Sequence, residues 1–249
     1  MSTTHDCCSN GFPQVPSRRE WLKTGAVAGA LAVAGVTSVT GAAQAASLTR
    51  EQRDAMTPDQ VLDMLREGNA RFRAGTMQSH DFLAQKRATA TGQFPAAVIL
   101  SCIDSRAPAE IIFDTGIGDV FGARIAGNIA NSDLIGSMEF ACAVAGAKLV
   151  LVMGHTGCGA IAGAINNVEL GNLTGLLERI RPAVGLSHYA GERSGGNREF
   201  VDAGARANVL HTKDQVRQLS PLLADLEKKG GIRIVGAMYN LENGEVEFM

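Results

Sequence analysis

The sequence has few aromatic residues, no excess of basic residues and no regular set of cysteines. Aromatic side chains make up 5% of its 249 residues whereas 45% are hydrophobic, so the core is predicted to be aliphatic. The formal net charge of -2 provides no basic surface, and we therefore expect no nucleic-acid partner. Five cysteines are an odd number, and they form no disulfide framework. The length suits one domain plus an extension.

Residues 1–46 are predicted to be an export signal and not part of the fold. Ser17–Lys23 resembles the twin-arginine motif, with Trp21 where phenylalanine is usual, and Ala43–Ala45 is a plausible cleavage site. The apolar stretch Thr24–Val39 is too short for a comfortable membrane span. We expect export of the folded protein to the periplasm or beyond, without a stable membrane anchor. A disordered or amphipathic tail and an uncleaved anchor are the alternatives.

Two clusters of chemically versatile side chains follow two apolar runs. The run Ala96–Leu100 predicts a buried strand and leads into Cys102–Arg106, which holds a thiol, a carboxylate and a guanidinium. The run Leu149–Met153 leads into His155–Gly159. Packing alone seldom explains such a cluster at the end of a buried strand, because charges at the core edge must be paired or coordinated. Both clusters therefore indicate function.

The two clusters together predict a metal site. If the two strands are parallel neighbours, Cys102, His155 and Cys158 meet at one edge of the sheet. These residues form a Cys₂His set, which binds catalytic zinc and leaves a fourth position open. Burial as small core residues would explain each of them alone, but it does not explain the set. A helix predicted at 159–165 would place Cys158 near a helix N-terminus, which favours the thiolate.

The wider pattern predicts an α/β fold for residues 47–249. We expect a central, mostly parallel sheet of about four strands plus an edge strand, flanked by helices, with an N-terminal helical arm. A helix is predicted to start at Thr57, and the basic and polar residues that follow it, up to Thr91, are predicted to form a helical arm or a loop on the surface. Cys142 lies on the apolar face of a predicted helix and is interpreted as core packing. The strands are predicted at residues 96–100, 120–125, 148–154, 232–239 and 246–248, and the main helices at 57–72, 132–146, 159–165 and within 172–226.

At Cys102–Arg106 and His155–Cys158 the sequence resembles the β-class carbonic anhydrases. The resemblance extends from about Pro58 to Phe248. It also includes Leu65-x-x-Gly68-Asn69-x-Arg71-Phe72, Gly127-Asn128 and Gly236-Ala237-x-Tyr239. The family implies a carbonate dehydratase, a lyase that interconverts carbon dioxide and bicarbonate with one zinc ion per subunit. It also implies a homodimer or a multiple of dimers, with N-terminal helices clasping the neighbour and active sites at the subunit interface.

The resemblance assigns roles to particular residues of this chain. It implies that Cys102, His155 and Cys158 hold the zinc, that Asp104 and Arg106 form the catalytic pair, and that Asp104 binds the metal only in a closed state. It implies that Gln93, Phe121 and Gly157 contact substrate. The chain differs from several members at Ile125, Phe140 and Val144, where asparagine, tyrosine and a proposed proton-shuttle histidine occur. These differences concern proton exit and turnover rate.

The expected mechanism uses a hydroxide on zinc. The metal lowers the pKa of bound water toward neutrality, and the hydroxide attacks carbon dioxide held against apolar walls. Asp104 is expected to accept the hydroxide's hydrogen bond, and Arg106 to keep Asp104 ionised and oriented. A purely structural ion pair is the alternative for these two residues. A carbonyl sulfide or carbon disulfide hydrolase and a non-catalytic zinc-stabilised binding module are alternative functions. Asp104, Arg106 and Gln93 argue against the binding module.

Overall fold

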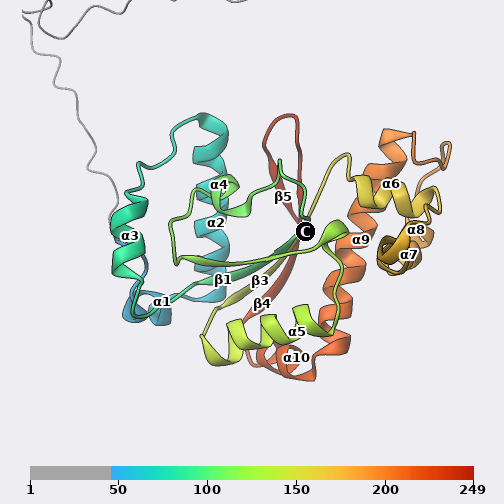
Figure 1. The fold of residues 1–249 in the computed structure, drawn as a ribbon. Coiled ribbons are helices and arrows are strands. Elements are labelled where there is room, and N and C mark those ends of the chain that lie inside the picture. Colours follow the sequence, from blue (N-terminus) through green and yellow to red (C-terminus); the bar gives the residue numbers. More distant parts are fainter. Residues whose placement is uncertain (1–45) are drawn as a thin grey trace, which may run out of the picture. The chain divides into compact units, whose positions relative to one another are not determined.

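The computed structural model describes residues 46–249, so the predicted export signal lies, except for Ala46, outside the described residues. The described residues form an α/β fold around one five-stranded sheet (Figure 1). The strand order is β2-β1-β3-β4-β5, with the first four strands parallel and β5 antiparallel to β4. The predicted fold class is confirmed. None of the helices within 46–249 has the length and apolar character that spanning a membrane requires.

The strands lie close to their predicted positions. They are β1 (Ala97–Ser101), β2 (Val120–Arg124), β3 (Leu149–His155), β4 (Arg233–Tyr239) and β5 (Val246–Phe248). The α-helices are α1 (Arg50–Ala55), α2 (Pro58–Ala74), α3 (Phe82–Ala88), α4 (Ala109–Ile112), α5 (Ser132–Glu139), α6 (Gly159–Ile165), α7 (Gly171–Glu178), α8 (Arg181–Leu186), α9 (Arg198–Leu219) and α10 (Pro221–Lys228). A 3₁₀ turn, η1 (Ala126–Asn128), follows β2, and a π-helical turn, η2 (Phe140–Val144), follows α5.

Helix α2 begins where the sequence predicts and covers one face of the sheet. The Thr57 side chain and the Gln60 side chain form a reciprocal capping box, and proline occupies the first helical turn. Val61 and Leu65 of α2 are fully buried against the sheet. The helix is therefore part of the protein's own core, whereas α3 lies at the periphery (Figure 1).

One helix ends differently from its prediction. The helix expected over residues 132–146 is α-helical only to Glu139 and then widens into the π-helical turn η2. The Ala145 N–H bonds to the Phe140 carbonyl, five residues back, and Gly146 at φ 83° ends the turn. An Arg53 guanidinium from α1 caps the Ala145 carbonyl. A contact from a distant helix thus stabilises a turn that helical periodicity alone does not predict.

Part of the family-like sequence serves packing. Gly68 of α2 approaches α4 so closely that a Cβ there would lie 1.9 Å from the Phe113 carbonyl oxygen. The neighbouring Asn69 donates to the Gly244 carbonyl at 2.9 Å and accepts from the Val246 N–H at 3.0 Å. This pair therefore joins α2 to α4 and to the predicted β4–β5 hairpin, which the structure contains.

The strand order creates a switch point between β1 and β3. The chain passes from β1 to β2 on one side, and then returns across β1 to place β3 on the other side. Connections leave β1 and β3 in opposite directions, which opens a crevice at their carboxyl ends. Both predicted metal-binding clusters lie at the carboxyl ends of these two strands. The fold therefore brings the clusters together at the position where such sheets bind ligands.

Candidate metal centre

Three potential ligands meet at the switch point. The ligand atoms of Cys102, His155 and Cys158 all lie within 4.8 Å of one another, and all three residues are buried. Cys102 directly follows β1, His155 is the last residue of β3, and Cys158 is the N-cap of α6. Ser101 pairs with Met153 in the parallel register, which places the two strand ends side by side. The structure thus brings the predicted set together.

The hydrogen bonds of His155 leave one ring nitrogen free for a metal. Its Nδ1 lies 2.9 Å from the Thr156 carbonyl oxygen and donates to it. Its Nε2 is buried and has no hydrogen-bond partner among the described residues. A buried polar atom without a partner is costly, and a metal ion would satisfy it. One imidazole nitrogen and two sulfurs form a donor set that fits zinc.

The two sulfurs are electrostatically coupled. A hydrogen bond from the Cys158 side chain lowers the pKa of Cys102 against the opposing effect of burial. The same contact, together with burial, raises the pKa of Cys158. A metal ion binds both sulfurs as thiolates, so its binding would release any proton that the pair holds. Cys142 differs, because burial raises its pKa to about 12 and it packs in the core as predicted.

Asp104 lies beside the three ligands and is held by Arg106. The Arg106 guanidinium donates to the two carboxylate oxygens at 3.0 and 2.8 Å, and its backbone N–H donates at 2.9 Å. These hydrogen bonds hold the pKa of Asp104 well below its usual range. Oδ2 of Asp104 lies 3.8 Å from Nε2 of His155. The carboxylate is therefore ionised and engaged by Arg106, outside the group of three ligands.

An apolar cavity of about 370 Å³ opens beside Cys102 and Asp104. Its other walls come from the loop after β1, the η1 turn, α6, the segment between α6 and α7, and α7 itself. They are Ile103, Ala126, Gly159, Ala160, Gly163, Val168, Leu173 and Leu177. Apolar walls with a few polar groups at one end are typical of small-molecule sites. The cavity can hold a small apolar molecule next to the ligands.

The family model for carbonic anhydrases matches residues 97–246, which include all three candidate ligands. A β-carbonic anhydrase of the fungal pathogen Aspergillus fumigatus has a similar fold, with a TM-score of 0.58 and 26% identity, over 77% of this chain and 89% of that one. The chain belongs to the β-class carbonic anhydrase family. This confirms the resemblance and the prediction that the protein is an enzyme.

Two bacterial members of the family are closely similar to this chain. Carbonic anhydrase 2 of Mycobacterium tuberculosis is 39% identical, over 72% of this chain and 87% of that protein. The carbonic anhydrase of Mycolicibacterium smegmatis is 35% identical, over 74% of this chain and 89% of that protein. The similarity therefore covers most of the described residues.

Arg124 is a site residue of this carbonic anhydrase for which the sequence predicts no role. Its guanidinium donates to the Cys102 carbonyl at 2.9 Å and to the Asp104 carbonyl at 2.5 Å. It is the last residue of β2 and pairs with Ser101 across the parallel register. Arg124 thus fixes the backbone that carries the candidate metal ligand Cys102 and the Asp104 carboxylate. The strand register is the signal that could have identified it.

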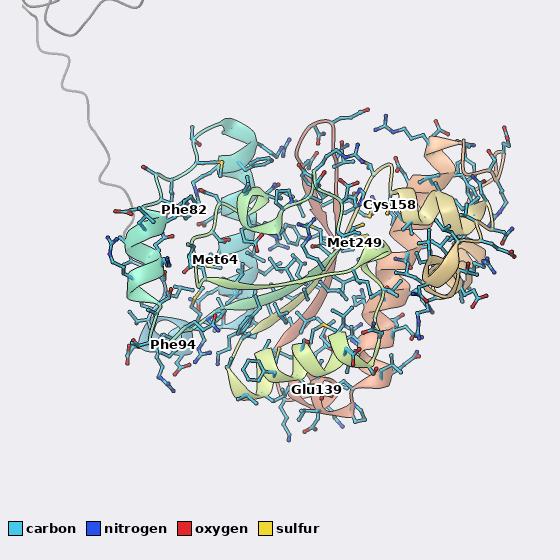
Figure 2. All side chains as sticks on the ribbon, in the orientation of Figure 1. Met64, Phe82, Phe94, Glu139, Cys158 and Met249 are labelled. Atoms are coloured by element: carbon cyan, nitrogen blue, oxygen red, sulfur yellow. The ribbon has the colours of Figure 1, made fainter. Side chains whose placement is uncertain are left out.

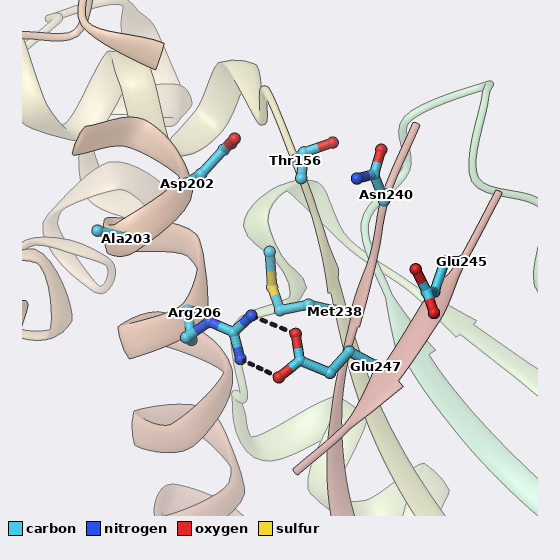
Figure 3. A pocket seen from close by; sticks show the side chains of 8 residues that line it. All are labelled: Thr156, Asp202, Ala203, Arg206, Met238, Asn240, Glu245 and Glu247. Carbon is cyan, nitrogen blue, oxygen red and sulfur yellow. Dashed lines mark hydrogen bonds and ion pairs between the residues drawn. The ribbon is translucent and has the colours of Figure 1, made fainter. Parts of the chain in front are cut away.

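Gly157 is hydrogen-bonded to a residue of α9 and does not line the cavity beside Cys102. It has φ 61°, a conformation that glycine adopts freely, and its N–H donates to Oδ1 of Asp202 at 2.6 Å. Its predicted substrate contact would therefore not use this N–H. A second cavity, of about 520 Å³, lies between α9 and the β4–β5 hairpin. Asp202 lines it, and so does the ion pair between Arg206 and Glu247 (Figure 3). None of the three candidate ligands lines that second cavity.

A single chain does not bring Gln93 and Phe121 to its own metal centre. Gln93 precedes β1, at the amino edge of the sheet, whereas Cys102 follows the strand. Figure 2 shows Phe94 and Cys158 well apart. Phe121 lies on edge strand β2, where its ring meets the Phe140 ring edge-on at 6.3 Å. Neither predicted substrate-binding residue lines the cavity beside Cys102, because parallel strands place them near the opposite edge.

Proposed function

We propose that the protein is a zinc enzyme that interconverts carbon dioxide and bicarbonate, with one zinc ion per subunit held by Cys102, His155 and Cys158. The buried ligand set, with the unpartnered Nε2 of His155 next to an ionised Asp104, carries this proposal. When bound, zinc supplies a Lewis acid that lowers the pKa of bound water to near neutrality. The family membership supports the same reaction.

The chain's own groups orient the reactants. Asp104 is charged and can only accept hydrogen bonds. It therefore accepts a hydrogen bond from the reacting water, which directs a lone pair of that water toward the substrate. Arg106 holds the carboxylate by two parallel bonds, which fix its plane. The walls formed by Ala160, Val168 and Leu173 hold apolar carbon dioxide and exclude bulk water.

Turnover of two substrates tests this proposal against the hydrolase alternative. Carbonyl sulfide could occupy the same apolar cavity, so the purified protein is given carbon dioxide and carbonyl sulfide in parallel. Hydration is followed by stopped flow, and hydrolysis by release of hydrogen sulfide. We expect carbon dioxide to be turned over much faster. Faster turnover of carbonyl sulfide would replace the proposed substrate, and no turnover of either would favour a binding module.

We propose that a second copy of the chain covers the free edge of β2. This strand ends the sheet, and the adjoining η2 turn exposes Phe140 and Val144 by 53% and 73%. A cavity of about 560 Å³, lined in part by Phe121 and Phe140, lies between β2 and α5. The distance of Gln93 from its own metal centre supports a site completed by a partner, as the family resemblance implies. The proposed assembly is a homodimer or a multiple of dimers.

Replacing Phe140 with aspartate tests the proposed interface. A charge in a buried apolar interface must be desolvated, so F140D should be mainly monomeric at micromolar concentration. Because the site is completed by the partner, hydration should fall at least about tenfold. Light scattering after size exclusion measures the mass. Leu186→Asp on α8, which replaces another exposed apolar residue, is the control and should stay oligomeric. An F140D protein with wild-type mass would place the interface elsewhere.

We propose that residues 1–46 direct export of the folded protein by the twin-arginine route. The Arg18–Arg19 pair ahead of a mildly apolar stretch supports this proposal. Changing both residues to lysine keeps the charge, so any electrostatic attraction to the membrane survives while the motif is lost. The double variant should accumulate as precursor in the cytoplasm, measured by fractionation and immunoblotting. Export at the normal rate would exclude this route.

A further inference from the structure

The side-chain amide of Asn208 in α9 is buried and donates a hydrogen bond to the η1 turn beside the candidate metal centre. The residue is 0% exposed, and its Nδ2 donates to the Gly127 carbonyl at 2.7 Å. Its Oδ1 has no hydrogen-bond partner within the described part of the chain. An apolar residue of similar size would avoid the cost of burying this amide. The bond to Gly127 is therefore the feature that explains an asparagine here.

The turn that Asn208 holds is conformationally unusual. Gly127 and Asn128 have φ 67° and 42°, so two successive residues adopt the left-handed region. Such conformations persist where the surroundings fix them. A Cβ on residue 127 would lie 2.5 Å from Cδ1 of Ile180, so a side chain there has no room. Glycine rotates freely about its backbone bonds, and a contact from outside must therefore fix its orientation.

The other side of Gly127 faces a metal ligand. Its N–H donates to Sγ of Cys102 at 3.4 Å. A hydrogen bond to a thiolate withdraws electron density from sulfur, so it tunes the ligand that the metal receives. Gly127 thus connects Asn208 to Cys102 through its two backbone groups.

We propose that Asn208 is a positioning residue for the metal centre, because its bond to the Gly127 carbonyl keeps the Gly127 N–H directed at the Cys102 sulfur. This inference rests on the proposed metal site. A purely structural role for Asn208 would change only the stability of the packing between α9 and the η1 turn. A positioning role also changes the electronic state of the metal-bound sulfur, so the test must observe that sulfur.

The test compares Asn208→Leu with Thr212→Val. N208L keeps a similar volume but removes the donor, whereas T212V replaces a buried polar residue one turn further along the same helix. Each protein is loaded with Co²⁺, and its near-ultraviolet thiolate-to-cobalt charge-transfer band is recorded. Zinc affinity is measured by competition with a chromophoric chelator. Thermal unfolding of the metal-free proteins reports packing separately.

In N208L the charge-transfer band should move to longer wavelength, because the sulfur loses its hydrogen bond. Zinc affinity should fall about 10- to 100-fold, the usual effect of losing an outer-shell partner. T212V should match the wild type in both. An unshifted band and unchanged affinity in N208L, even with lower stability, would reduce Asn208 to packing. A wild type that binds neither metal would overturn the proposed function instead. If N208L does not fold, Asn208→Ser, whose hydroxyl is too short to reach, must show the same shift.

Discussion

The Cys158→Ser protein is expected to lose nearly all of its zinc and its hydration activity, while Cys142→Ser keeps both. A serine hydroxyl stays protonated near neutral pH, so the site would exchange an anionic, soft sulfur for a neutral oxygen. Zinc affinity should fall by more than about 100-fold, because removing a residue that only hydrogen-bonds a metal ligand already lowers affinity about 10- to 100-fold. The neighbouring Cys102 and His155 would then form an incomplete set.

Cys142 is a matched control for this substitution. It is buried like Cys158, but it packs in the apolar core, and burial raises its pKa to about 12. C142S therefore places the same hydroxyl in a buried site without touching the ligand set. Zinc content by elemental analysis and hydration by stopped flow are measured on the same samples. Stoichiometric zinc in C158S, or loss of zinc in C142S, would show that the ligands are wrongly assigned.

The Asp104→Asn protein should keep its zinc but hydrate carbon dioxide about 10²- to 10⁴-fold more slowly, the usual contribution of a positioned acid–base group. Asparagine has nearly the shape of aspartate, so the loop and the three ligands should survive. The amide presents a donor where the reacting water needs an acceptor, and it cannot hold Arg106 by two charge-assisted bonds.

The defect of the D104N protein should not vary with pH near neutrality. Arg106 holds the pKa of Asp104 well below its usual range, so the wild-type carboxylate is charged throughout about pH 6 to 9. The ratio of wild-type to D104N rates should therefore be flat across that range. Asp225→Asn, at a surface ion pair with Lys229, is the control and should be near normal. Near-normal rates with full zinc in D104N would make Asp104 a structural residue, whereas loss of zinc would make it a ligand.

The sequence predicts those parts of the site that depend on local pattern. The apolar runs before Cys102 and His155 define two buried strands. Because both residues lie at the ends of these strands, the strands determine where they lie. The glycine after Cys158 predicts the helix that begins there. The juxtaposition of the three ligands follows because parallel neighbours end at one edge of the sheet.

Other parts of the site depend on contacts that no local pattern encodes. Arg124 reaches the Cys102 and Asp104 carbonyls only because β2 pairs with β1 in one particular register. Asp202 and Asn208 act from α9, which lies far along the chain and presents them to two different loops. In α9 they look like ordinary polar residues of an amphipathic helix. Their partners are backbone atoms, which leave no complementary residue in the sequence to indicate the contact.

The roles that the family resemblance assigns to Gln93 and Phe121 can be judged only with the fold in hand. Gln93 and Phe121 match pocket residues in sequence, yet a single chain places them away from the cavity beside Cys102. The match and the fold are compatible if a second copy supplies these side chains. A motif alone thus predicts the chemistry of a residue but not the chain whose site it completes.

We propose above that zinc at Cys102, His155 and Cys158 makes this protein hydrate carbon dioxide. The most direct test measures zinc content and stopped-flow hydration on one sample, before and after removal of the metal with a chelator, and again after zinc is restored. We predict one zinc per subunit, with hydration that disappears with the metal and returns in proportion to the zinc restored. A protein with one zinc per subunit and no hydration, or with hydration that persists after complete removal of the metal, would contradict the account.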